Sequence, residues 1–225
     1  MQVLGDRHGN IIWLGERECS IQRRHQKIIE EAPSSFLDNE TREQMGEQAV
    51  KLAKEVEYYS AGTVEFVVND KKEFFFLEMN TRLQVEHPVT EAVTGIDLVE
   101  QMINIANNKA LKIDQQSIKT SGWAFESRIC AENPKKNFLP SAGRIKEFIY
   151  PDKNTRVDLG YKSGDEVSIF YDSLIAKVIS KGSNRDNAIK NMQKTLQELS
   201  IKGIETNLDF LMDIYKNPLF AKGDI

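Results

Sequence analysis

The stretch from Phe74 to Glu91, FFFLEMNTRLQVEHPVTE, constrains the fold of this chain more than any other. In an extended backbone, successive side chains point to opposite faces. One face would then carry a row that passes from aromatic to polar: Phe74, Phe76, Glu78, Asn80, Arg82 and Gln84. The other face is apolar apart from Thr81. Carboxylate, amide and guanidinium groups in one row predict a site for a metal and an anion, with a structural ion-pair ladder as the alternative.

A second strand is predicted just before this stretch, over Thr63–Val68, and polar turn residues separate the two strands. A hairpin with an even-numbered loop pairs Val67 with Phe76 and Glu65 with Glu78. Directly opposed Cβ atoms lie about 4.5–5.5 Å apart, and like charges at that distance are destabilising. The pattern therefore requires something positive between the two carboxylates.

Either a metal ion or a single shared proton would relieve this repulsion. The side-chain oxygen of Asn80 adds a third hard ligand to those of Glu65 and Glu78, and Mg²⁺ typically takes one or two carboxylates together with water and substrate phosphates. Because Arg82 continues the same row, we favour the metal and predict a metal site at Glu65, Glu78 and Asn80.

Composition excludes several classes of function. The 225 residues are 40% hydrophobic and 28% charged with a net charge of −4, so the chain has no basic excess for a nucleic-acid surface. Cys19 and Cys130 are too few for a disulfide scaffold and form no Cys-x-x-Cys pair. The chain shows neither an apolar run of membrane-span length nor a signal-peptide pattern. We expect a soluble, intracellular protein with no nucleic-acid or membrane partner.

Positive charge is concentrated locally in the segment Cys19–Ile29, which contains RRHQK beside isoleucines. In an extended conformation, Arg23, His25 and Lys27 would face one way. Such a cluster is usually a solvated face, here with Glu30 and Glu31 as partial neutralisation. The flanking aliphatic residues favour a second interpretation, a partly buried site for phosphate or bicarbonate.

Glu86, and the pair of Glu126 and Arg128, are two further candidate functional positions. Pro88 interrupts extended structure, which places Glu86 where a strand ends and a loop begins. A glutamate there is either an ordinary exposed side chain or a general base. In the predicted strand 122–131, Glu126 and Arg128 share a face, and a structural pair between them is the default interpretation.

The other predicted elements divide the chain into two parts. The first part has strands at 1–4 and 11–14 and helices at 38–56 and 97–106, and the mostly polar stretch 107–120 is the best candidate boundary. The second part has strands at 144–150, 156–158, 166–169 and 173–180 and helices at 184–199 and 207–215. We predict domains at residues 1–115 and 116–225.

Four motifs together resemble the biotin carboxylases, which are ATP-grasp ligases: QRRHQK at 22–27, GTVEF at 62–66, EMNTRLQVEHPVTE at 78–91 and FLPS at 138–141. The resemblance covers essentially the whole chain. It implies an α+β fold, in which the C-terminal portion of an ATP-grasp fold is followed by a biotin carboxylase C-terminal β-rich domain with helices.

The resemblance also implies roles for individual residues. Mg²⁺ or Mn²⁺ on the ATP phosphates would be held by Glu65, Glu78 and Asn80. The nucleotide would be approached by Gln22 and His25, together with Glu65 and Glu78. Bicarbonate would be held by Lys27, Arg82, Gln84 and the backbone amide of Val85. Glu86 would deprotonate bicarbonate, and Arg128 would stabilise the enolate of biotin.

The implied enzyme is the biotin carboxylase component of an acyl-CoA carboxylase, located in the cytoplasm or, in a eukaryote, in the mitochondrial matrix. Its expected partners are a biotin carboxyl carrier domain, a carboxyltransferase (beta) subunit and the N-terminal biotin carboxylase part. Strand pattern begins at Met1, so we expect a partial chain with little or no ATPase activity alone. The alternatives are another ATP-grasp ligase, such as a carbamoyl-phosphate synthetase half, and a non-catalytic assembly module.

Overall fold

The structure is a computed structural model that describes residues 1–151 and 155–224. It divides into two compact units, each containing helices and sheets, which confirms the α+β class. The first unit is Met1–Glu18 with Glu31–Ser121, and the second is Cys19–Glu30 with the chain from Gly122 onward. The basic segment thus belongs to the second unit, although it lies early in the sequence. The predicted domain boundary near residue 115 stays a prediction.

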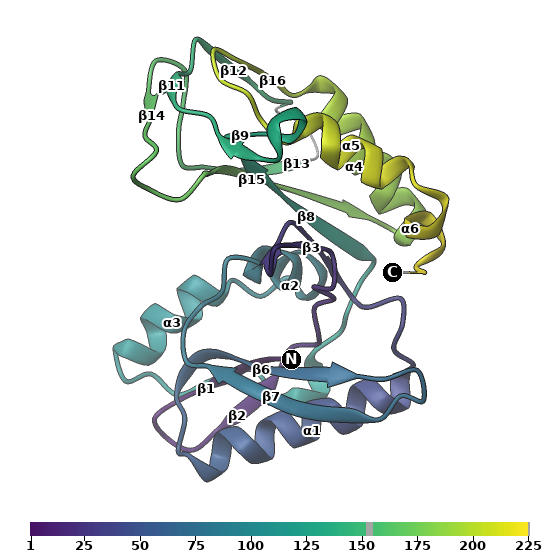
Figure 1. Cartoon of the computed structure of the whole chain (residues 1–225). Helices are drawn as coiled ribbons and strands as arrows, with labels where there is room; N and C mark the ends of the chain where they lie inside the picture. Colours follow the sequence, from purple (N-terminus) through teal and green to yellow (C-terminus); the bar gives the residue numbers. More distant parts are fainter. Residues whose placement is uncertain (152–154, 225) are drawn as a thin grey trace. The chain divides into compact units, whose positions relative to one another are not determined.

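The first unit is built on an antiparallel sheet in the order β2-β1-β6-β7 (Figure 1). Its strands are β1 (Gln2–Gly5), β2 (Ile11–Trp13), β6 (Ser60–Val68) and β7 (Phe74–Asn80). Apolar residues fill both faces because alternate side chains point opposite ways. Val3 belongs to the core on the side of α1 (Asn39–Glu55), and Leu4 belongs to the core on the side of α3 (Leu98–Ala106).

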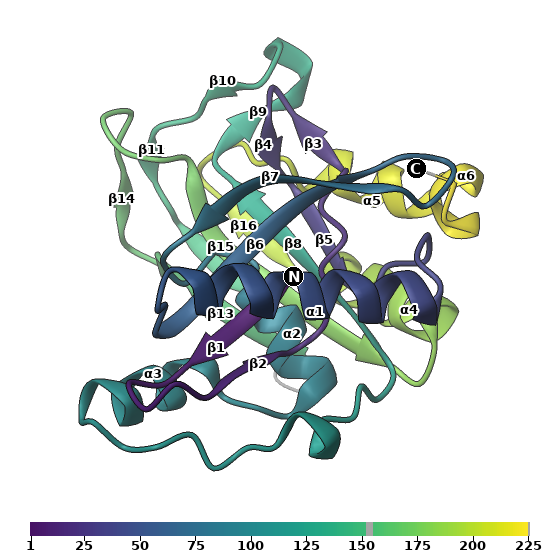
Figure 2. The ribbon, with the colours of Figure 1, turned by 90° about the horizontal axis from the view of Figure 1, so that it is seen from below.

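Helix α1 runs across the strands on one face of this sheet, as Figure 2 shows. Its predicted start is confirmed, since Asp38 is the N-cap and accepts a hydrogen bond from Thr41 N at 2.8 Å. The predicted start of α3 is confirmed in the same way, with Asp97 accepting from Glu100 N at 2.8 Å.

The hairpin of β6 and β7 confirms one predicted pairing and corrects another. Glu65 lies opposite Glu78, as expected, but Val67 lies opposite Phe75 rather than Phe76. The register shifts by one residue next to Glu65, so β7 contains a β-bulge.

The bulge also reverses which side chains of β7 share a face. Phe74 packs into the same core cluster as Met79, so the prediction that Phe74 lies on the Glu78 face is wrong. Phe74 and Met79 are an odd number of positions apart, which would place them on opposite faces of a regular strand. Because the bulge adds one extra residue between them, they share a face. The alternation of polar and apolar residues could not reveal this, because residues 74–77 are all apolar.

Strand β7 ends at Asn80, so the predicted continuation of the strand through Arg82 and Gln84 is wrong. A short turn leads directly into α2 (His87–Thr94), with Glu86 as its N-cap residue and Pro88 in its first turn. Proline is tolerated there because the first helical N–H groups have no partner within the helix. Glu86 therefore lies at the start of a helix that the sequence analysis missed.

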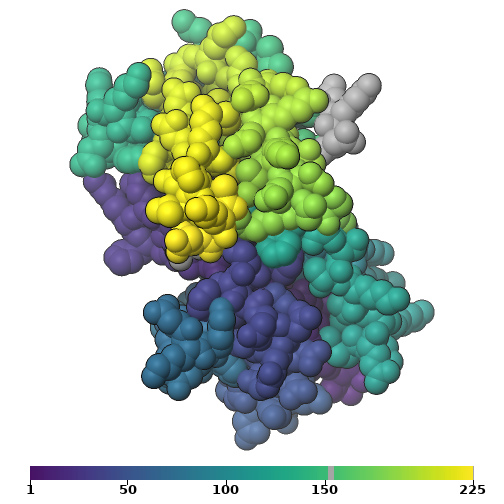
Figure 3. Space-filling view, turned by 90° about the vertical axis from the view of Figure 1, so that its right-hand side faces the viewer, coloured from purple at the N-terminus to yellow at the C-terminus, as the bar shows by residue number. Residues whose placement is uncertain are grey.

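The second unit contains a sheet in the order β13-β15-β8-β5. Its strands are β5 (Ile29–Ala32), β8 (Trp123–Cys130), β13 (Thr155–Leu159) and β15 (Leu174–Gly182). The helices are α4 (Arg185–Glu198), α5 (Leu208–Lys216) and α6 (Pro218–Lys222), and Figure 3 shows the green α4 segment beside the yellow C-terminal segment. Their apolar side chains complete one core with β8 and β15.

The remaining strands of the second unit form short antiparallel pairs. They are β3 (Gln22–Arg23) with β4 (Gln26–Lys27), β9 (Glu132–Asn133) with β10 (Leu139–Pro140), β11 (Gly143–Arg144) with β14 (Glu166–Val167), and β12 (Glu147–Ile149) with β16 (Ser200–Lys202). Two 3₁₀ turns, Gln115–Ser117 in the first unit and Pro134–Lys136 in the second, complete the described elements.

Candidate metal and anion site

The carboxylates of Glu65 and Glu78 are joined by a single amide. Asn80 Nδ2 donates to Glu65 Oε1 at 3.2 Å and to Glu78 Oε1 at 2.8 Å. Gln84 Nε2 donates to the same Glu65 oxygen at 2.7 Å. The antiparallel register and the turn after β7 thus bring together four of the residues that the sequence analysis singled out.

The donor set of this cluster fits a small hard cation. The nitrogen and oxygen of an amide have nearly the same position after a half-turn, so Asn80 can present Oδ1 where Nδ2 now lies. Two carboxylates and one amide oxygen would then face one point, which is the kind of set that Mg²⁺ completes with water and substrate phosphates. Within residues 1–151 and 155–224, no three His, Cys, Asp or Glu side chains gather where they could hold a metal ion by themselves.

The turn from Gln84 to His87 is fixed by one carbonyl group. Gln84 O accepts from His87 N at 3.2 Å, and His87 Nδ1 lies 2.8 Å from the same oxygen. Glu86 has φ −83° and ψ 9°, which suits the third residue of a type I turn. Gln84 and Glu86 are 5% and 2% exposed, so both side chains are withdrawn from bulk water.

Arg17 is a residue of this site that the sequence analysis missed. Its Nη1 donates to Gln2 Oε1 at 2.7 Å and to Thr90 Oγ1 at 3.0 Å. Its Nη2 donates to Thr63 Oγ1 at 2.9 Å and to Gln84 Oε1 at 2.8 Å. These partners are distant in sequence, so neither spacing nor periodicity could have connected them.

Arg82, which was predicted to hold the anion, lies just beyond β7 with an exposed side chain. Its Nη1 is 3.4 Å from Leu83 O, a distance at the weak end of hydrogen bonding. The guanidinium therefore has little to hold it in this conformation, and its role stays a prediction.

The basic segment in the second unit is a tight hairpin rather than one extended strand. Gln22 pairs with Lys27, and Arg24 and His25 form the turn with φ of 50° and 64°. Two consecutive residues with positive φ are typical of two-residue hairpins. The prediction that Arg23, His25 and Lys27 share a face is wrong. Residues that pair directly lie on the same face of a hairpin, so Lys27 shares a face with Gln22 and not with Arg23.

Two cations in this unit contact acidic side chains that the sequence analysis did not assign to them. Arg23 forms an ion pair with Glu132 at 2.6 Å. Arg128, which is 8% exposed, donates from Nε to Glu30 Oε1 at 2.6 Å. The expected partner of Arg128, Glu126, has Lys177 Nζ at 3.8 Å.

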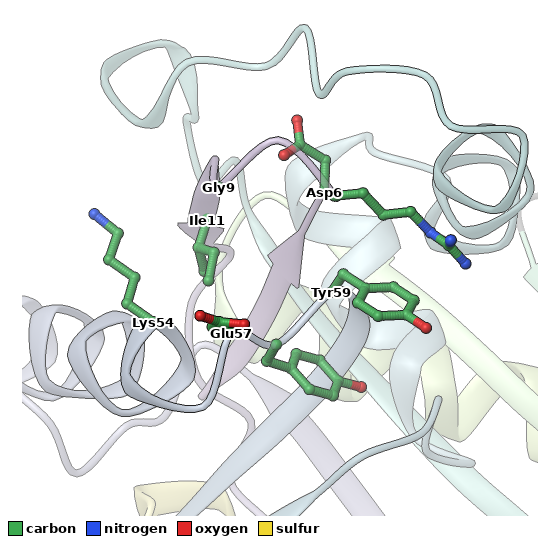
Figure 4. Close-up of a pocket in the computed structure, with 8 residues that line it drawn as sticks. Asp6, Gly9, Ile11, Lys54, Glu57 and Tyr59 are labelled. Carbon is green, nitrogen blue, oxygen red and sulfur yellow. The ribbon is translucent and has the colours of Figure 1, made fainter.

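A separate pocket of about 480 Å³ opens at the end of β1 and α1 (Figure 4). Its lining mixes charges and aromatic rings: Asp6, Arg7, Gly9, Ile11, Lys54, Glu57, Tyr58 and Tyr59. None of the residues predicted to bind metal, nucleotide, bicarbonate or biotin lines it. This pocket is therefore separate from the cluster of acidic and amide groups described above.

Comparisons with known proteins agree with the motifs. Residues 1–114 match the family model of the carbamoyl-phosphate synthase L chain, ATP binding domain, and residues 126–225 match that of the biotin carboxylase C-terminal domain. The chain is 55% identical to the mitochondrial propionyl-CoA carboxylase alpha chain of Homo sapiens and 50% identical to the propionyl-CoA carboxylase alpha chain of Ruegeria pomeroyi. All of the chain is aligned, but it spans only 31% and 36% of these relatives.

Among solved structures, the biotin carboxylase domain dimer of Hydrogenobacter thermophilus 2-oxoglutarate carboxylase, in complex with MgADP, ADP and bicarbonate, is 47% identical with a TM-score of 0.97. The match covers 99% of this chain and 49% of that one. In the described residues, no helix combines the length and apolar character needed to cross a membrane.

Proposed function

Since the chain belongs to the family of the carbamoyl-phosphate synthase L chain ATP-binding domain, in its biotin carboxylase branch, we propose that it supplies part of the site for ATP- and bicarbonate-dependent carboxylation of biotin. The observation that carries this proposal is the convergence of Glu65 and Glu78 on Asn80, at 3.2 and 2.8 Å. Two carboxylates and one side-chain amide together form a set of ligands that suits a divalent cation.

An apolar surface next to the carboxylates supports a nucleotide as the ligand. Val67 and Phe75 pair across the hairpin and are 55% and 58% exposed. Val67 follows Glu65 by two residues and so lies on the same face of the sheet. A nucleotide bound to this face would place its phosphates at the carboxylates. Its planar base would then lie over the apolar pair.

In the proposed reaction, bicarbonate binds beside this cluster through Arg82, Gln84 and the Val85 amide, and Glu86 takes its proton. The bicarbonate oxygen then attacks the γ-phosphorus of ATP, the bond to the ADP oxygen breaks, and carboxyphosphate forms. Carboxyphosphate breaks down to CO₂ and phosphate, the phosphate takes the N–H proton of biotin, and the biotin nitrogen then forms a bond to the carbon of CO₂. A bound Mg²⁺ or Mn²⁺ would neutralise charge on the ATP phosphates. The protein's part is mainly positioning and electrostatic stabilisation.

The family resemblance implies further roles for residues of the second unit. Gln22 and His25 would contact the nucleotide, Lys27 the bicarbonate, and Arg128 the biotin. For Arg128, the buried Glu30 carboxylate at 2.6 Å supports this role by holding the guanidinium in one orientation. These assignments come from the family resemblance and remain proposals.

We further propose that the acyl-CoA carboxylated downstream is propionyl-CoA, because the first relatives are propionyl-CoA carboxylase alpha chains. At 48% identity, a methylcrotonoyl-CoA carboxylase subunit alpha is nearly as similar. A biotin carrier, a carboxyltransferase subunit and, in a eukaryote, a mitochondrial location follow from the same likeness.

A chimera tests the function directly. This chain replaces the matching segment of the Ruegeria pomeroyi alpha chain, and ATP cleavage is measured with bicarbonate and biotin. We expect cleavage that requires both, and its loss in a Glu86→Gln variant. Stimulation by glutamine or ammonia in place of biotin would indicate a carbamoyl-phosphate synthetase activity. A folded but inactive chimera would favour an assembly module and contradict the proposal.

A further inference from the structure

We propose that Arg17 is a positioning residue that fixes the polarity of the Gln84 side-chain amide, so that its NH₂ group faces Glu65 and the anion site. The inference rests on the proposed function only for the identity of that anion. Its structural part, the orientation of one amide by one guanidinium, is independent of the reaction.

Two groups of opposite charge hold the side-chain amide of Gln84. Arg17 Nη2 lies 2.8 Å from Gln84 Oε1, and Gln84 Nε2 lies 2.7 Å from Glu65 Oε1. A guanidinium only donates hydrogen bonds and an ionised carboxylate only accepts them. The reverse orientation of the amide would set NH₂ against a cation and oxygen against a carboxylate, so only one orientation satisfies both neighbours.

The guanidinium of Arg17 is itself held in place. Nη1 is bound by Gln2 Oε1 and Thr90 Oγ1, and Nη2 is also bound by Thr63 Oγ1. Gln2 is oriented in turn, because its Nε2 donates to the carbonyl oxygens of Val3 and Gly62 at 3.0 and 2.9 Å. The rigid fork of arginine matches these acceptors, whereas a lysine ammonium is a single point charge.

The orientation of the Gln84 amide also determines what it offers to an anion. An amide NH₂ has two hydrogens, and Glu65 accepts one of them. With Gln84 held in this polarity, the other hydrogen can donate to an oxygen of bicarbonate. Without Arg17, one of the two groups that fix this polarity would be lost, and the Gln84 amide would present its second hydrogen to the anion less often. Arg17 would thus influence binding without touching the substrate.

The test follows the side-chain amide of Gln84 by NMR in this chain, labelled with ¹⁵N-glutamine. The Gln84 signals are assigned by their disappearance in Gln84→Leu. We expect the solvent exchange of the Gln84 NH₂ hydrogens to be roughly tenfold faster in Arg17→Met than in wild type. Thr90→Val is the matched control, because it removes one Nη1 contact and leaves both Nη2 contacts. It should stay close to wild type.

Wild-type exchange rates in a folded Arg17→Met variant would overturn the proposal. If Arg17→Met does not fold, Arg17→Lys gives the same comparison, with an intermediate rate expected and a wild-type rate again contradicting it. A second readout uses the chimera: Arg17→Lys should raise the KM for bicarbonate roughly tenfold and leave the KM for ATP nearly unchanged. Because the NMR result does not need an active enzyme, an inactive wild-type chimera would reject the function without rejecting the role of Arg17.

Discussion

Asn80 shows at the scale of one residue how the site resolves a conflict of charge. Its amide donates to both Glu65 and Glu78, which lie directly opposite each other. Replacement by aspartate would remove these donors and add a third carboxylate. We expect Asn80→Asp to lower the free energy of unfolding by about 1–3 kcal/mol without metal, and MnCl₂ to restore part of it. Urea unfolding with and without MnCl₂ measures both effects.

Asn104→Asp is the control for this substitution, because Asn104 is half-buried and its side-chain oxygen accepts from Lys109 Nζ. A new carboxylate there faces a cation, so neither a loss of stability nor a response to MnCl₂ is expected. An equal response of the two variants would mean that the Glu65–Glu78 cluster is not a cation site.

Some residues of the site could be predicted from the sequence and others could not. The predicted pairing of Glu65 with Glu78 is confirmed, but the even-numbered loop from which it was derived is wrong. Val68 pairs with Phe74, which leaves a loop of five residues, and the bulge in β7 compensates for it. The sequence did not indicate that Arg17 belongs to the site, because its place there depends on hydrogen bonds to partners from β1, β6, α2 and the turn after β7. Contacts between distant segments are set by tertiary packing, which a local pattern does not encode.

At the scale of elements, Asp6 ties the turn between β1 and β2 to the segment after α3. It accepts hydrogen bonds from His8 N, Asn10 N, Asn10 Nδ2 and Leu111 N. Burial raises the pKa of Asp6, but these hydrogen bonds outweigh burial and lower the pKa from 3.8 to about 2. A carboxyl group with a depressed pKa stabilises the folded state above its unfolded pKa and loses that effect as pH falls toward the folded pKa.

We therefore expect Asp6→Asn to be less stable than wild type at neutral pH by about 2 kcal/mol, which is the free energy that corresponds to this shift. The difference should shrink between about pH 4 and about pH 2, as Asp6 protonates in the wild type. Urea unfolding of both proteins across this range measures it. A difference that is constant with pH would show that Asp6 acts through packing alone.

Helix α1 depends on a glycine where it crosses β2. A Cβ atom built on Gly46 would lie 2.4 Å from the ring of Trp13, so alanine there requires the ring or the helix to move. Alanine improves helix propensity by about 1 kcal/mol, but overpacking costs about 1–3 kcal/mol. We expect Gly46→Ala to lower the melting temperature, while the exposed Glu47→Ala on the same helix leaves it nearly unchanged. A more stable Gly46→Ala protein would contradict this packing.

The sequence predicted long, strongly periodic elements well and short ones poorly. Helices α1 and α3 begin where they were predicted to begin, with Asp38 and Asp97 as their N-caps. The bulge in β7, the β3–β4 hairpin and helix α2 were missed. Each depends on one or two residues whose pattern also fits another structure. Pro88, for example, lies in the first turn of α2, but a proline is equally expected in a loop after a strand.

At the scale of the whole molecule, each unit has its own apolar core. Met192 lies in the core of the second unit and Leu98 in a core of the first, and both side chains are fully buried. A large-to-small substitution in a core typically costs about 2–5 kcal/mol. We expect Met192→Ala to speed amide hydrogen exchange in β8 and β15 but not in β6, and Leu98→Ala to do the reverse. Faster exchange in every strand from either substitution would show that the units unfold together.

The whole fold could be predicted only by resemblance. Periodicity located most strands of the second part, but it could not show that Cys19–Glu30 packs with the chain after Gly122. Such a long-range association leaves no periodic trace in the sequence, and only the four motifs tied these segments to one family.

Glu65 and Glu78 are proposed to hold a divalent cation together, and crystals of this chain soaked in MnCl₂ would reveal that ion. We expect an anomalous difference peak about 2 Å from one carboxylate oxygen of each glutamate, and no such peak in Glu78→Gln crystals soaked in the same way. A soaked wild-type crystal with manganese bound elsewhere, and none between these two carboxylates, would contradict it.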